Sequence, residues 1–144
     1  MRLDQEAAEK AYLTASKEVG RIAMAGGAAK PTKILLATTA GDYLEVQISE
    51  LKYLKERGLR ADKPVRSTVV ANGGWTPTEI GLTACEDATQ VRLLKKNGKD
   101  FKQENRPQRA IQTLTATKKA GVWKITDLDT KFVKSFDGEP GCQP

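Results

Sequence analysis

The spacing of apolar residues changes once along the chain, and this change constrains the fold more than any other feature. Before Pro64, apolar residues recur every three or four positions, which is the period of an amphipathic helix. After Pro64 they recur at every second position, which is the period of a strand with one buried face. Helices followed by a run of strands predict an α+β domain with an antiparallel sheet.

Helices are expected in the first part of the chain. The first carries an apolar stripe of Ala8, Tyr12, Ala15, Val19 and Ile22, and glycines 26–27 end it. Pro31 precedes a short second helix over 32–37. Asp42 is expected to cap a third helix that Gly58 ends. The apolar stripe of that helix comprises Leu44, Ile48, Leu51 and Leu54.

The strands are expected after a polar linker over 60–64. Their ranges are 65–75, 78–88, 90–95, 109–118 and 122–133. Glycines 73–74 predict a bulge or bend, and the segment 96–99, Lys-Asn-Gly-Lys, is typical of a hairpin turn. We expect one domain over 1–144, with the N-terminal helices packed in the concave face of a curved antiparallel sheet.

The chain contains no histidine. This excludes a Ser-His-Asp triad, a Cys-His dyad and every zinc site that uses histidine. The two cysteines are too far apart in sequence for a Cys-x-x-Cys metal pair. We therefore expect neither a metal nor a cofactor.

The chain is basic, with 24 Lys and Arg against 18 Asp and Glu. A basic balance is compatible with nucleic acid, an anionic membrane surface or an anionic wall polymer as partner. Aromatic residues make up only 6% of the chain, so the basic clusters at 95–102 and 106–119 lack the interleaved rings on which single-stranded bases stack. Specific nucleic-acid binding is not expected, and an anionic surface remains as an alternative to a simply solvated face.

Cys85 and Cys142 leave two alternatives, one disulfide or two free thiols. A disulfide would tie the polar tail over 135–144 to a core strand, and closing a loop of this length stabilises by about 4 kcal/mol in the chain-entropy model. We expect the disulfide, and with it an oxidising compartment outside the cytoplasm. The chain opens Met1-Arg2-Leu3-Asp4, which is polar and unlike a signal peptide. The alternatives are a cytoplasmic protein or an export segment upstream of these residues.

The order of elements resembles the cystatin-like superfamily that includes nuclear transport factor 2. The segment 72–99, NGGWTPTEIGLTACEDATQVRLLKKNGK, is similar to the middle of a family of small secreted or lipid-anchored proteins from actinobacteria and their phages. The shared motifs are the Cys-Glu-Asp strand end at 85–87, the Arg-Pro-Gln-Arg loop at 106–109, the Gly-x-Trp-Lys-Ile strand at 121–125 and a cysteine near the end. The resemblance covers roughly residues 5–142.

This resemblance implies a nuclear transport factor 2-like cone and an upstream lipidated cysteine that anchors the protein to the outer face of the cell membrane. It implies no assigned activity. The leading hypothesis is a non-enzymatic interaction module of the cell envelope, whose partner is an envelope protein or an anionic surface. A phage or prophage origin is one form of this hypothesis. By analogy, a homodimer would form through the sheet face. The alternatives are a small-molecule binder or enzyme that uses the cone cavity, and a subunit of a conjugation or secretion assembly.

Several proteins with this fold are enzymes with an acidic residue inside the cone. Asp127 is the candidate general base here, because strict alternation places it on the same face as Trp123 and Ile125. With Tyr12 on the first helix, these residues are the candidate cavity-lining set. No second catalytic group pairs with Asp127 in the sequence, so we expect no enzyme. We also expect a filled or narrow apolar core.

Overall fold

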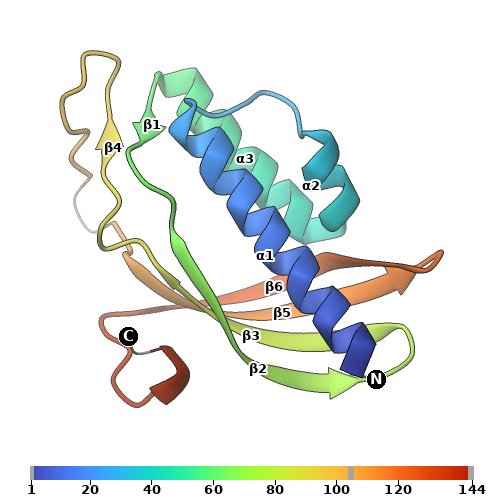
Figure 1. Ribbon diagram of the computed structural model, residues 1–144. Coiled ribbons are helices and arrows are strands. Elements are labelled where there is room, and N and C mark those ends of the chain that lie inside the picture. Colours follow the sequence, from blue (N-terminus) through green and yellow to red (C-terminus); the bar gives the residue numbers. More distant parts are fainter. Residues whose placement is uncertain (1, 104–105, 143–144) are drawn as a thin grey trace.

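The computed structural model describes residues 2–103 and 106–142 (Figure 1). Its helices are α1 (Arg2–Met24), α2 (Lys33–Thr38), α3 (Gly41–Arg57) and the 3-10 turn η1 (Pro140–Cys142). Its strands are β1 (Arg60–Ala61), β2 (Arg66–Trp75), β3 (Glu79–Asp87), β4 (Leu93–Leu94), β5 (Arg109–Lys119) and β6 (Val122–Val133). The predicted order of helices and then strands is confirmed.

The long strands form one antiparallel sheet in the order β2-β3-β5-β6. Helices α1, α2 and α3 lie over one face of this sheet, which we call the inner face (Figure 1). The C-terminal segment lies against the opposite, outer face. The α+β architecture with an N-terminal helix packed on an antiparallel sheet is therefore confirmed.

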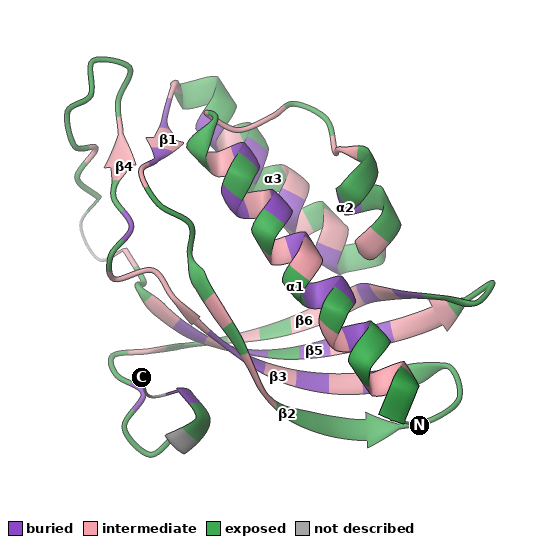
Figure 2. Ribbon diagram, in the orientation of Figure 1, coloured by how far each residue is buried: buried purple, intermediate pink, exposed green. Residues whose placement is uncertain are grey.

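The apolar stripe of α1 packs on the inner face of the sheet (Figure 2). Tyr12 and Ala15 are fully buried, and Val19 is half-buried. The main core joins α1 to alternate residues of β3, β5 and β6; it comprises Ala8, Ala11, Tyr12, Tyr43, Ile80, Leu82, Ala84, Leu114, Ala116, Trp123 and Ile125. Burial of this stripe removes apolar area from water and holds the helix on the sheet.

The starts of α2 and α3 differ in their capping. The Thr32 side chain caps α2 by accepting a hydrogen bond from the Leu35 amide. Asp42 does not cap α3, contrary to prediction: the cap residue is Ala40, whose amide donates to the Ile125 carbonyl of β6. This backbone bond fixes where the helix begins, and Asp42 falls inside its first turn. Gly58 ends α3 in the left-handed conformation, as expected.

Two short strands build an arm beside the sheet. The expected linker over 60–64 contains β1, which pairs with β4. The expected strand over 90–95 is reduced to β4 and does not join the main sheet. Asp62 explains this pairing, because its carboxylate accepts from the Arg92 amide at 2.7 Å and from the Arg92 guanidinium at 3.0 Å.

A bulge in β6 changes which residues face inward. Thr115 pairs with Asp127, whereas the next residue of β5, Ala116, pairs with Ile125, so Thr126 is the extra residue. A bulge of one residue shifts the alternation beyond it to the other face. Trp123 and Ile125 are buried as predicted, but Asp127 is exposed. The inward placement of Asp127 was wrong for this reason.

A disulfide joins Cys85 of β3 to Cys142 of η1, as predicted, with 5.5 Å between the two Cα atoms. Cys85 lies on the outer face, and Phe136 packs with both cysteines in a small apolar cluster. The tail over 135–142 is thus tied back to the sheet, while 143–144 lie outside the described residues. A disulfide of this kind is typical of proteins in oxidising compartments outside the cytoplasm.

A candidate ligand cavity between α1 and α3

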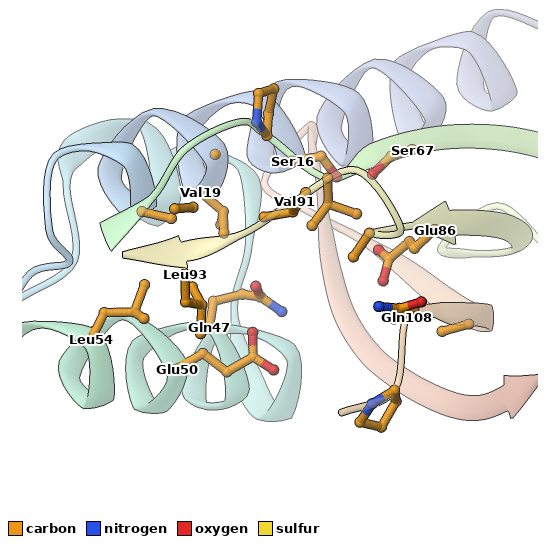
Figure 3. Close-up of a pocket in the computed structure, with 18 of the residues that line it drawn as sticks. Ser16, Val19, Gln47, Glu50, Leu54, Ser67, Glu86, Val91, Leu93 and Gln108 are labelled. Atoms are coloured by element: carbon orange, nitrogen blue, oxygen red, sulfur yellow. The ribbon is translucent and has the colours of Figure 1, made fainter. Parts of the chain in front are cut away.

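A cavity of about 580 Å3 lies between α1, α3, the inner face of the sheet and the arm (Figure 3). We call it the α1/α3 cavity. Its volume falls in the range of small-molecule sites. The filled core that we predicted is present around Trp123 and Ile125, but it does not extend to this open cavity. The main core is closed, but it occupies the other end of α1.

The arm and the segment after it form one wall of the cavity. Pro64 lies so close to α1 that a Cβ added at Gly20 would come within 2.9 Å of the Pro64 Cβ. Glycine at this position therefore allows the segment to cross the helix. Leu93 of β4 and Val91, two residues before it, extend this wall. Because the arm stands off the sheet, side chains from α1 and α3 do not fill the space beneath it.

Most of the cavity lining is apolar. Val19 comes from α1, Leu54 from α3, and Val91 and Leu93 from the arm (Figure 3). Leu54 and Val91 are buried, and the other two are half-buried. A lining of this kind favours a ligand with an apolar body.

Glu86 is the inward carboxylate at the end of β3. The Tyr12 hydroxyl donates to one carboxylate oxygen at 2.7 Å, and the Gln112 amide donates to the other at 3.0 Å. Burial, and then the negative charge of Glu86, raise the pKa of Tyr12. Tyr12 therefore stays a neutral donor, and Glu86 is held in place with its charge toward the cavity (Figure 3).

Glu50 projects into the cavity from α3, opposite the sheet (Figure 3). Its side chain stays accessible because the cavity is open. Desolvation by the surrounding protein, and then the charge of Glu86, raise the pKa of Glu50. Within the described part of the chain, no group forms a hydrogen bond or an ion pair with its carboxylate.

Gln47 lies one turn before Glu50 on α3 and also faces the cavity (Figure 3). Its side chain is only 9% exposed. No described residue forms a hydrogen bond with its amide, and the amide remains within reach of solvent. Buried amides are ordinarily hydrogen-bonded, so this one is available to a ligand.

Tyr43 closes the inner end of the cavity. Its ring is 3% exposed and belongs to the main core. Burial, followed by the charges of Glu86 and Glu50, raises the pKa of Tyr43, against a hydrogen bond with Ser16 that lowers it. The phenol therefore remains neutral.

The candidate residues from the sequence do not line this cavity. Tyr12 supports it through Glu86, whereas Trp123 and Ile125 pack in the closed core and Asp127 faces outward. The sequence contains a signal for Glu86, because alternation along β3 places it on the same face as Ile80, Leu82 and Ala84. No comparable signal marks Glu50, since the arm that encloses it depends on contacts between distant segments.

The described residues contain no group of three or more cysteine or acidic side chains that could hold a metal ion. No helix in the same part of the chain is both long and apolar enough to cross a membrane.

Comparisons with known proteins add to the description of the fold. No model of a known protein family matches the chain, and no curated protein sequence matches it. A solved structure, the intermembrane space region of the chloroplast protein ARC6, is similar with a TM-score of 0.61 and 14% sequence identity. The match covers 89% of this chain and 96% of that chain. At this identity the similarity extends to the fold alone.

Proposed function

We propose that this protein is a non-enzymatic binding module of the cell envelope that holds a small molecule in the α1/α3 cavity. The observation that carries the proposal is the cavity itself, an open space of about 580 Å3 with apolar walls and a few polar groups. This combination is typical of small-molecule sites. Small-molecule binding and an envelope location thus form one proposal.

The location and the finer fold assignment belong to the same proposal. The disulfide supports export, and the resemblance of segment 72–99 to secreted or lipid-anchored proteins supports a tether on the outer face of the cell membrane. A long helix over one face of a twisted sheet is compatible with a nuclear transport factor 2-like cone. An envelope protein or an anionic surface is the proposed macromolecular partner, and a homodimer through the sheet face stays a prediction.

Two observations support binding without catalysis as part of this proposal. The carboxylate expected to act as a base, Asp127, lies outside the cavity. Both oxygens of Glu86 are already engaged, because they accept hydrogen bonds from Tyr12 and Gln112. Its arrangement suits electrostatic recognition of a ligand better than proton transfer.

A screen of small molecules by thermal shift, followed by calorimetry of the hits, tests the proposal. Val19→Phe places a ring in the cavity and should weaken the binding of every true hit by about tenfold or more. Leu13→Phe, on an exposed position of the same helix, is the matched control and should bind like the wild type. Circular dichroism verifies that both variants are folded. Hits that bind Val19→Phe unchanged would place the site elsewhere and refute the cavity function.

A further inference from the structure

We propose that the α1/α3 cavity selects an organic cation, an amine or ammonium group carried on an apolar body, with Glu50 and Glu86 as its counter-charges. This inference rests on the proposed function and names its ligand class. It starts from two carboxylates. The protein as a whole is basic, with a formal net charge of +6, yet Glu50 and Glu86 both face this cavity. Three cations, Lys63, Arg106 and Arg109, also belong to its lining.

Glu50 is the main observation. Its carboxylate has no bonding partner among the described residues, and the like charge of Glu86 acts on it. Two carboxylates that face the same cavity repel one another and favour a positive charge beside them. A bound cation would relieve this repulsion and would restore the ordinary acidity of Glu50.

The cationic side chains near the cavity are engaged elsewhere. The Arg109 guanidinium donates to the Lys134 carbonyl at 2.8 Å, and its charge acts on Asp87. The Arg106 guanidinium donates to the Val91 carbonyl at 3.3 Å.

Lys63, the remaining cation of the lining, is exposed, and its charge acts on Asp62. Within the described part of the chain, none of these three cations forms an ion pair with Glu50.

Gln47 is the second, independent observation. The residue is 9% exposed, its side chain faces the cavity, and its amide has no protein partner among the described residues. Its carbonyl oxygen can accept an N–H of an ammonium group whose charge faces Glu50 on the next turn of α3. An ammonium ion has several donors and therefore suits a set of carboxylate and amide oxygens.

The apolar walls of the cavity indicate what the rest of the ligand is like. Val19, Leu54 and Val91 offer an apolar surface, which a small hydrated inorganic ion would not use. Calcium and magnesium require several oxygen ligands in a compact shell, and the described residues bring no third acidic side chain to this pair. The geometry therefore favours an amine attached to an apolar group over a metal ion.

Three probes of nearly equal shape test this inference: phenylhexylamine, phenylhexanol and phenylhexanoic acid. Calorimetry at neutral pH and low salt gives their dissociation constants for the full chain. Charge-assisted hydrogen bonds are stronger than neutral ones, so the amine should bind about tenfold or more tighter than the alcohol, and the acid should bind weakest.

Glu50→Gln removes the uncompensated charge with little change of shape. It should weaken amine binding by about tenfold and leave alcohol binding unchanged. Glu45→Gln, on an exposed face of the same helix, removes one charge outside the cavity and is the matched control. It should leave both affinities at the wild-type value.

The outcomes separate the two proposals. Equal affinity for the three probes, tightest binding of the acid, no binding of the amine, or an amine affinity that is insensitive to Glu50→Gln would each overturn the cationic ligand class. Displacement of the amine by millimolar calcium through Glu50 would replace it with a metal ion. If screening hits still lose affinity in Val19→Phe, the cavity function stands without this ligand class; if they do not, both proposals fail.

Discussion

The indole N–H of Trp123 donates a 3.0 Å hydrogen bond to the carboxylate of Asp4, which joins β6 to the first turn of α1 across 119 positions of sequence. The Lys118 ammonium lies 3.5 Å from the same carboxylate and 5.9 Å from the centroid of the Trp123 ring. The hydrogen bond from Trp123 is the largest influence that lowers the pKa of Asp4. The start of the helix is thus fixed to the end of the sheet by one aromatic residue.

Trp123→Ala should destabilise the protein by about 3–5 kcal/mol, because it deletes a large buried ring from the main core. Chemical denaturation monitored by far-UV circular dichroism measures this loss. Trp123→Phe keeps most of the ring and removes the donor to Asp4, so it should cost less, about 1–2 kcal/mol. A loss within about 0.5 kcal/mol for Trp123→Ala would be typical of an exposed position and would contradict this packing.

Removal of the disulfide should destabilise the protein without unfolding the sheet. The chain-entropy model gives about 4 kcal/mol for a closed loop with a separation of 57 residues. Cys85→Ser with Cys142→Ser should therefore lower the melting temperature and free the tail over 135–142 for proteolysis. The mass of the wild-type protein should rise by two hydrogens on reduction. Two thiols that alkylate freely in protein purified under oxidising conditions would exclude the bond.

The regular elements could be predicted because each depends on a local pattern. The stripe of α1 has the helical period, and the alternation along β3 and β5 matches their burial. The glycines 73–74 coincide with a register shift between β2 and β3, as expected. The disulfide followed from the number and placement of the cysteines. Local periodicity and composition determine these features before any tertiary contact forms.

The cavity could not be predicted in the same way. The cavity exists because Arg92 donates hydrogen bonds to Asp62, next to the paired strands β1 and β4. These contacts hold the segment around β4 away from the main sheet. Pairing between residues 30 positions apart leaves no period in the sequence. Glu50 therefore looked like one more polar residue on an amphipathic helix. Its place in the cavity depends on this arm.

The bulge at Thr126 gives a prediction that separates the two residues that follow it, Asp127 and Leu128. No glycine marks this bulge in the sequence. The Thr126 hydroxyl lies 2.8 Å from the Thr117 hydroxyl and 3.3 Å from the Thr115 carbonyl oxygen. Asp127→Ala should change stability by no more than about 0.5 kcal/mol, as exposed substitutions do. Leu128→Ala should cost about 2 kcal/mol, since Leu128 packs against the main core. Thermal or urea unfolding of both variants compares them, and the reverse order would restore uninterrupted alternation.

Glu18 gives the last prediction, a dependence of stability on pH. This carboxylate is 4% exposed and accepts hydrogen bonds from the Arg21 guanidinium at 2.7 and 3.0 Å and from the Thr32 hydroxyl at 2.7 Å. The hydrogen bonds from Arg21 lower the pKa of Glu18 most, against the opposing effect of burial. The bonds join α1 to the cap of α2.

A lowered pKa in the folded state means that the unfolded chain binds the proton more readily. The contribution of Glu18 is therefore complete above the ordinary glutamate pKa, about 4.3, and is lost as the pH falls through the folded-state value. Glu18→Gln should cost about 1–3 kcal/mol at neutral pH. Its deficit relative to the wild type should shrink as the pH falls below about 4. Urea unfolding across this pH range measures the deficit, with Glu9→Gln on the same helix as control. A deficit that stays constant down to acid pH would show that the carboxylate charge does not stabilise the junction between α1 and α2.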